Sequence, residues 1–333
     1  MADLLPIPFL LLVIIIIALI FDFLNGFHDS SNIVATMISS RAMSPRAALT
    51  MTAIAEFSGP FLFGVAVATT IGSEVVDPEA ITSAVIIAAL SSAICWNLIT
   101  WYFGWPSSTS HALIGGLIGS VAMAEGFHTI NLAGMEKVLI ALFISPILGL
   151  VFGFLTLRLI YFLARGATPG INVWFKRGQW GTSLALALSH GTNDAQKTMG
   201  IMAMAMVTTG YVDEFHVPWW VVTLSASAIA LGTFSGGWRL IETLGGKFYK
   251  IRPVHAFGSQ LTSASIILGA ALLGGPVSTT QVVSSAIMGA GSADRVSKVR
   301  WTVARDIAVA WLLTIPVSAL LAAGLYLLVD LVL

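Results

Sequence analysis

The chain has 333 residues, of which 57% are hydrophobic and only 10% are charged. A soluble globular domain carries about 25% charged residues. The 16 basic and 16 acidic side chains are therefore too few for a water-soluble enzyme or a nucleic-acid-binding protein of this size. The lone cysteine, Cys95, excludes a disulfide framework and a multi-cysteine metal site. The composition predicts an all-α, polytopic integral membrane protein.

Apolar stretches long enough to cross a bilayer, about 20 residues each, recur along the chain. The first has no Lys or Arg before Arg41, so it does not resemble a signal peptide and is expected to be retained. Two stretches, 81–124 and 254–291, begin and end on the same side of the membrane and are each expected to form a helix pair or a re-entrant hairpin. Single crossings are predicted at 7–40, 47–72, 137–160, 178–209, 219–238 and 303–329. The total is about ten membrane segments.

The placement of charge predicts the orientation of these segments. All but two of the 16 basic residues lie in four segments, at 41–46, 158–177, 239–252 and 294–306. The polar breaks at 73–80, 125–136 and 210–217 contain acidic residues and no basic ones. Basic loops stay in the cytoplasm. We therefore expect a multi-pass protein of the cell's inner (plasma) membrane, with both termini outside.

Two sequence motifs occur twice, in the same order. Residues 26–32 (GFHDSSN) align with 191–197 (GTNDAQK), and residues 106–111 (PSSTSH) align with 276–281 (PVSTTQ). The charge pattern gives the two copies opposite orientations. This predicts a first repeat at 1–165, a basic cytoplasmic linker at 166–179 and a second, inverted repeat at 180–333. Inverted repeats with interrupted helices are typical of secondary transporters, whose sites lie near the membrane midplane.

The first pair of motifs places a carboxylate inside an apolar stretch. Asn25-Gly26 and residues 191–193 are turn-forming, so we expect the helices to break there, just before Asp29 and Asp194. A carboxylate at this depth costs about 3 kcal/mol unless it is paired or functional. Carboxylate, amide and carbonyl oxygens are hard ligands, which suit Na⁺ or Mg²⁺ better than a soft metal. The alternative is that each Asp only caps the following half-helix.

The second pair of motifs places hydroxyl side chains where a helix is expected to begin. The hydroxyl residues of these runs are Ser107, Ser108, Thr109, Ser110, Ser278, Thr279 and Thr280. Together with the free N–H groups of the first helical turn, they offer a neutral set of donors suited to a tetrahedral oxyanion. The alternative is ordinary packing of small residues between membrane helices.

Several other polar residues are secondary candidates. Glu56 could couple or gate transport, or could simply be paired. Lys197 could offset Asp194, approach the anion or extend to the interface. His28 and His190 could carry protons, although histidines in such places are more often structural. Gln196 and Gln260 complete the set.

These motifs resemble those of the inorganic phosphate transporter (PiT) family, in its bacterial form. The matching residues are 25–32 (NGFHDSSN), 101–111 (WYFGWPSSTSH), 189–197 (SHGTNDAQK) and 275–280 (GPVSTT). The resemblance implies uptake of phosphate coupled to Na⁺ or H⁺, at a site formed by both repeats. The implied partners are inorganic phosphate, a monovalent cation and the lipid bilayer, with no further cofactor and no nucleic acid; a homo-oligomer is left open.

Carried over by position, Asp29 and Asp194 would bind the cation, assisted by Asn25, Asn32 and Asn193. The hydroxyl residues of the two helix starts would bind phosphate. Gln281 replaces a His found in many relatives, and Gln260 replaces a Glu found in animal relatives. Both differences leave the coupling ion open, and sulfate-carrying relatives leave the anion open.

Proteins of other classes fit the sequence less well. An intramembrane hydrolase could use Ser189, His190 and Asp194, but adjacent residues on a helix point apart. An ATP-driven pump would need a Gly-x₄-Gly-Lys-Ser/Thr loop, which the sequence does not contain. An anion channel is the nearer alternative to a carrier.

Overall fold

A computed structural model describes residues 7–73 and 80–333 of the chain. These residues form twelve α-helices and a few short 3₁₀ and π segments, without a β-sheet, as predicted from composition. The acidic residues expected at the first outer break, Glu74, Asp77 and Glu79, lie outside the described residues.

The same order of elements occurs twice along the chain. Each half has a long helix, a bent helix pair, a helical hairpin and a second long helix. The first half contains α1 (Phe9–Ser39), α2 (Pro45–Phe63) with α3 (Ala66–Ser73), α4 (Ser83–Phe103) with α5 (Thr109–Ala124), and α6 (Leu132–Leu163). The second contains α7 (Ile171–Thr208), α8 (Trp219–Ser235) with α9 (Trp238–Glu242) and the π segment η4 (Thr243–Lys247), α10 (Pro253–Leu272) with α11 (Thr279–Asp294), and α12 (Trp301–Asp330).

Four helices in the described part of the chain, α1, α4, α6 and α12, are long and apolar enough to cross a membrane, and each bent pair could add one span. The hairpin helices α5 and α11 have 16 residues each. At 1.5 Å per residue such a helix is about 24 Å long, less than the roughly 30 Å of a hydrocarbon core. The predicted total of ten segments is therefore not confirmed, whereas a multi-pass membrane protein is.

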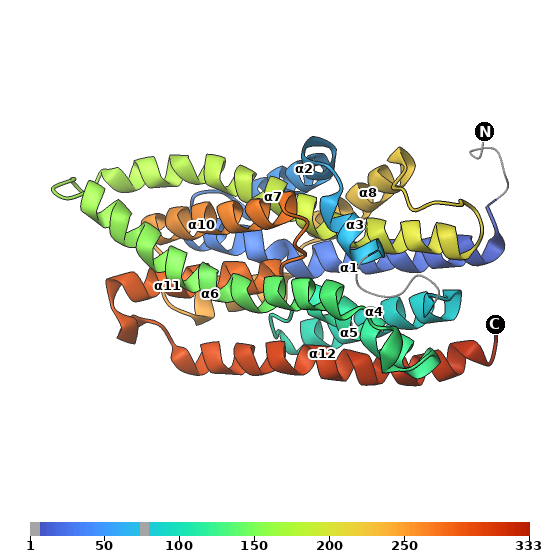
Figure 1. The fold of residues 1–333 in the computed structure, drawn as a ribbon. Coiled ribbons are helices and arrows are strands. Elements are labelled where there is room, and N and C mark those ends of the chain that lie inside the picture. Colours follow the sequence, from blue (N-terminus) through green and yellow to red (C-terminus); the bar gives the residue numbers. More distant parts are fainter. Residues whose placement is uncertain (1–6, 74–79) are drawn as a thin grey trace.

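The start of α1 and the end of α12 lie at the same end of the helix bundle (Figure 1). The turn between α6 and α7 lies at the opposite end. The linker expected at 166–179 is shorter than predicted, because residues 171–179 already form the first turns of α7. This arrangement agrees with termini on one side of the membrane and the linker on the other. Which of these sides faces the cytoplasm remains a prediction from charge.

The helix breaks expected at Asn25-Gly26 and at 191–193 were predicted wrongly, because α1 and α7 are continuous through both. The glycines instead let helices approach closely. A Cβ on Gly26 would lie 2.0 Å from the carbonyl oxygen of Ile229 in α8, and one on Gly191 would lie 2.3 Å from that of Glu56 in α2. Asp29 and Asp194 are consequently mid-helix residues and not helix caps.

The real interruptions lie in the bent pairs. The chain turns by 81° between α2 and α3 and by 63° between α8 and α9. Gly64 and Gly236 mark these bends and have positive φ angles, 81° and 72°, which glycine adopts without strain.

Gln196 of α7 supplies hydrogen bonds at the first bend. Its side-chain Nε2 donates to the carbonyl oxygen of Gly64 (2.6 Å), and its Oε1 accepts from the backbone N–H groups of Val67 (2.7 Å) and Ala68 (3.3 Å). These backbone groups have no partner within their own helices. Gln196, a secondary site candidate, therefore has a structural role in the described contacts.

Replacing Gln196 by Leu is expected to destabilise the protein by about 1–3 kcal/mol, because two buried N–H groups and one partly buried carbonyl group lose their partner while the side-chain volume is roughly kept. The measurement is the thermal stability of purified protein in detergent. The same stability as wild type would show that water or a shift of α3 replaces these bonds.

The last long helix of each half packs on the hairpin of the other half. The last helix of the first half, α6, packs on α11, and the last helix of the second half, α12, packs on α5. Trp311 of α12 also donates its indole N–H to the carbonyl oxygen of Pro106, at the tip of the first hairpin (2.9 Å). This packing holds the hairpin tips inside the bundle.

Candidate functional site

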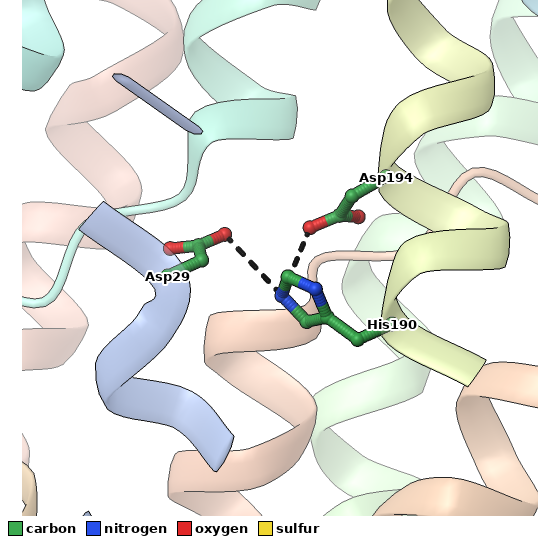
Figure 2. Close-up of side chains that lie close together, drawn as sticks. All are labelled: Asp29, His190 and Asp194. Atoms are coloured by element: carbon green, nitrogen blue, oxygen red, sulfur yellow. Dashed lines mark ion pairs between the residues drawn. The ribbon is translucent and has the colours of Figure 1, made fainter. Parts of the chain in front are cut away.

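The two repeated carboxylates come together in the interior, with His190 between them (Figure 2). Nε2 of His190 lies 3.2 Å from an Asp194 oxygen and 3.9 Å from an Asp29 oxygen. One ligand atom from each of the three residues falls within a 4.8 Å group, and all three residues are completely buried. The repeated motifs predict that Asp29 and Asp194 lie close together. In the structure Asp29 of α1 and Asp194 of α7 both face His190, in agreement with this prediction.

The two helix starts that carry hydroxyl groups meet at this centre. Ser108 and Ser278 are the N-cap residues of α5 and α11, and their hydroxyls accept hydrogen bonds from the N–H groups of His111 (3.1 Å) and Gln281 (3.3 Å). The hydroxyl of Ser110 donates to the carbonyl oxygen of Val277 (3.1 Å), which joins the two hairpin tips. The Pro of each motif, Pro106 or Pro276, lies two residues before the N-cap and therefore outside the helix.

Threonines from these tips bind the two carboxylates directly. Thr109 donates to Asp29 (3.2 Å), and Thr280 donates to its other oxygen (3.0 Å). The hydroxyl of Thr279 lies 2.9 Å from Asp194 and 3.3 Å from Asp29, and its single proton can serve only one of them at a time. The residues expected to bind a cation and those expected to bind an anion therefore form one hydrogen-bonded centre.

Lys197 is bound entirely within this centre. Its ammonium group contacts the Asp194 carboxylate and donates to the hydroxyl of Ser110 (2.5 Å) and the carbonyl oxygen of Val277 (3.1 Å). Its side chain is 2% exposed, so it does not extend to the membrane interface. Of the three roles predicted for this lysine, its contacts agree with the first, in which its charge offsets that of Asp194.

His28 connects Asp29 to the first hairpin. Its Nδ1 lies 2.9 Å from an Asp29 oxygen and its Nε2 lies 3.4 Å from the hydroxyl of Thr100. Ser107 donates to the same Thr100 hydroxyl (2.8 Å). No sequence motif contains Thr100, a single hydroxyl residue near the end of α4, and only the fold shows that it links His28 to Ser107.

The three asparagines add unpaired oxygen atoms. Asn32 donates to Thr280 (3.0 Å) and Asn193 donates to the carbonyl oxygen of Gly275 (3.1 Å). Among the described residues, the amide oxygens of Asn25, Asn32 and Asn193 are buried without a hydrogen-bond partner. Asn32 reaches Asp29 through Thr280, so its free oxygen extends the set of carboxylate and hydroxyl oxygens, which suits a hard cation. In the described structure no hydrogen bond joins Asn25 or Asn193 to the carboxylates.

The remaining candidates differ in their relation to the centre. Glu56 of α2 belongs to it, because its carboxylate lies 2.8 Å from Nδ1 of His190. Gln260 donates to Thr36 (2.8 Å) and accepts from Thr182 (2.7 Å), so its hydrogen bonds do not reach the carboxylates.

The geometry does not support a hydrolase. Ser189 donates its hydroxyl to the carbonyl oxygen of Ala185 one turn earlier (2.7 Å), whereas the ring nitrogens of His190 face Glu56 and Asp194. A nucleophile and its base must be within hydrogen-bonding reach of each other. The described contacts give Ser189 the role of an ordinary helix serine.

Membrane-crossing helices around one buried polar centre, reached by the tips of two hairpins, define the architecture of a membrane transport protein. Comparison with known proteins agrees. Residues 25–322 match the phosphate transporter family. The chain belongs to this family.

Its relatives share nearly the whole length of the chain. A probable low-affinity inorganic phosphate transporter of Bacillus subtilis is 43% identical, over 97% of this chain and 98% of the relative. A protein of the same description from Rhizobium meliloti is 44% identical, over 97% of each chain. A solved structure described as the sodium-dependent phosphate transporter superposes with a TM-score of 0.87 and 26% identity, covering 97% of this chain and all of that one.

Proposed function

We propose that this protein imports inorganic phosphate by symport with a monovalent cation, through alternating access. One observation carries the proposal: the hydroxyl-bearing starts of α5 and α11 donate their hydrogen bonds to the same two carboxylates that would bind the cation. Phosphate as the substrate is supported by the descriptions of the relatives.

The shared hydrogen bonds suggest how the two ligands are coupled. An anion approaching the centre is repelled by the carboxylates that Lys197 does not neutralise, Asp29 above all, and the hydroxyls of Thr109, Thr279 and Thr280 are already engaged. A cation that binds the carboxylates removes the repulsion and replaces these donors, which can then turn to phosphate. Cation and phosphate would therefore bind better together than apart, and this coupling is reciprocal.

Alternating access is supported by the repeated order of elements. Each half contributes one long helix with an acidic residue and one hairpin tip to the centre. We propose that the halves are inverted repeats that rock around this shared centre. The bound ligands favour movement only by as much as their affinity differs between the two states.

The coupling ion is Na⁺ or H⁺. The oxygen-rich donor set suits Na⁺, and the structural relative is described as sodium-dependent. A proton would need only one carboxylate oxygen or one ring nitrogen of His190. Because the centre offers sites for both ions, transport measurements must distinguish between them.

The test is uptake of labelled phosphate into proteoliposomes, with a Na⁺ gradient and a pH gradient imposed separately and sulfate as a competitor. We expect saturable uptake above equilibrium with one of the gradients, phosphate–phosphate exchange without any gradient, and little inhibition by sulfate. Single-channel currents or uptake that never exceeds equilibrium would contradict the carrier, and stronger competition by sulfate than by phosphate would contradict the substrate.

A further inference from the structure

Lys197 breaks the correspondence between the two halves at the centre. The aligned motifs place it opposite Asn32, three residues after Asp194 just as Asn32 follows Asp29. It is the only Lys or Arg among the buried side chains of the described chain. An asparagine in one half thus corresponds to a lysine in the other.

The contacts of Lys197 are those of a bound cation. A lysine ammonium has three protons to donate. They are directed at a carboxylate (Asp194), a hydroxyl (Ser110, 2.5 Å) and a backbone carbonyl (Val277, 3.1 Å). These are three of the oxygen types that bind hard metal ions in proteins. The ammonium group also lies where the two hairpin tips touch, since the Ser110 hydroxyl itself donates to Val277.

Asp29 has no corresponding lysine or arginine. In the described structure its oxygens receive the hydroxyls of Thr109, Thr279 and Thr280 and face the rings of His28 and His190. Asn32, at the position matching Lys197, donates to Thr280 and not to Asp29. Asp29 is therefore the acidic residue of the pair whose charge is not matched by a fixed Lys or Arg.

We propose that Lys197 takes the place of one coupling cation at Asp194, so that only Asp29 exchanges a cation with the solution. A lysine side chain stays with the protein throughout the cycle, so its charge neutralises Asp194 without being transported. The carrier would then move one cation fewer per phosphate than a carrier with two exchangeable acidic sites. This inference rests on the proposed cation symport and specifies its stoichiometry.

The experiment replaces Lys197 by Asn, the residue at the matching position of the other half. Wild-type and K197N proteins are reconstituted in proteoliposomes at zero membrane potential, with the Na⁺ or pH gradient that drives wild-type uptake. Each cation moved per phosphate allows about tenfold accumulation for a tenfold cation gradient. We expect the limiting accumulation by K197N to exceed that of wild type by about a further tenfold.

Arg177→Asn is the matched control. Arg177 lies on the same helix but is exposed and stacks on Trp174 outside the centre, so its replacement removes one positive charge without touching Asp194. Its limiting accumulation should equal that of wild type. The same cation-to-phosphate ratio in K197N and wild type would overturn the inference.

A binding measurement covers the case in which K197N is folded but does not transport. Titration of the purified protein with the driving cation, at fixed phosphate, is expected to count one more bound cation in K197N than in wild type. An equal count would overturn the inference. Wild-type uptake without any cation dependence would instead contradict the proposed symport itself, so the two failures are distinguishable.

Discussion

Replacing Asp29 by Asn is expected to lower cation-driven phosphate uptake by at least about 100-fold, which corresponds to roughly 2.7 kcal/mol. Asn keeps the shape of the side chain but loses the negative charge that would bind the exchangeable cation. It also cannot accept hydrogen bonds at both positions that now receive the hydroxyls of Thr109 and Thr280. The variant should therefore bind the cation more weakly and hold the hairpin tips less firmly in position.

Asp306→Asn is the control for this prediction. Asp306 is a largely exposed carboxylate whose ion partner, Arg305, is exposed as well, so its loss should leave uptake within about twofold of wild type. Uptake is measured in proteoliposomes at matched protein content, after gel filtration has shown that each variant is folded. Full cation-driven uptake by D29N would contradict the assignment of the centre.

The corresponding change at Asp194 has a different expected outcome. Asp194→Asn would leave the buried Lys197 ammonium group with neutral oxygen partners only and no opposite charge. Removing one member of a buried ion pair typically costs about 3–5 kcal/mol. D194N should therefore lose stability as well as transport, which is why D29N is the cleaner variant.

Replacing Gly191 by Ala is expected to destabilise the protein by about 3 kcal/mol, near the upper end of the usual cost of overpacking. The added Cβ would lie 2.3–2.8 Å from three backbone atoms of Glu56, and backbone atoms cannot rotate away. Helix α2 would have to move from α7, which would also disturb the contact between Glu56 and His190. The measurement is the melting temperature of the purified protein in detergent, together with phosphate uptake.

Gly181→Ala, on the same helix, is the matched control. Gly181 is exposed, and a Cβ there would meet no atom within 4 Å. Alanine has a higher helix propensity than glycine, so this variant should be as stable as wild type or slightly more stable. Equal melting temperatures for G191A and G181A would show that the packing of α2 on α7 is looser than described.

The repeated motifs allowed the components of the centre to be predicted before the fold was known. Asp29 and Asp194 occupy matching positions of two similar segments, which indicates a shared role. The same holds for the hydroxyl runs at 107–110 and 278–280. The helical class followed from composition. The inverted orientation of the halves and their boundaries stay predictions from the placement of charge and from the repeated motifs.

Glycine was the main source of error. Gly26 and Gly191 were interpreted as turn residues, whereas in α1 and α7 they make room for a neighbouring backbone. Glycine permits both, and only the position of the packing helix decides between them. Most of the hydrogen-bond and ion partners of Lys197, His190 and Thr100 could not be predicted from the sequence either, because they are distant along the chain and only the fold brings them together.

The exchanged packing of α6 and α12 constrains how the chain can fold. Helix α5, in the first half, is covered by α12, which is synthesised after the other described helices, and α6 packs on α11, which is also synthesised later. Neither half can complete its own hairpin environment alone. The fold is thus reached only once the whole polypeptide has been inserted, and two fragments divided within 166–179 should assemble only when both are made in the same cell.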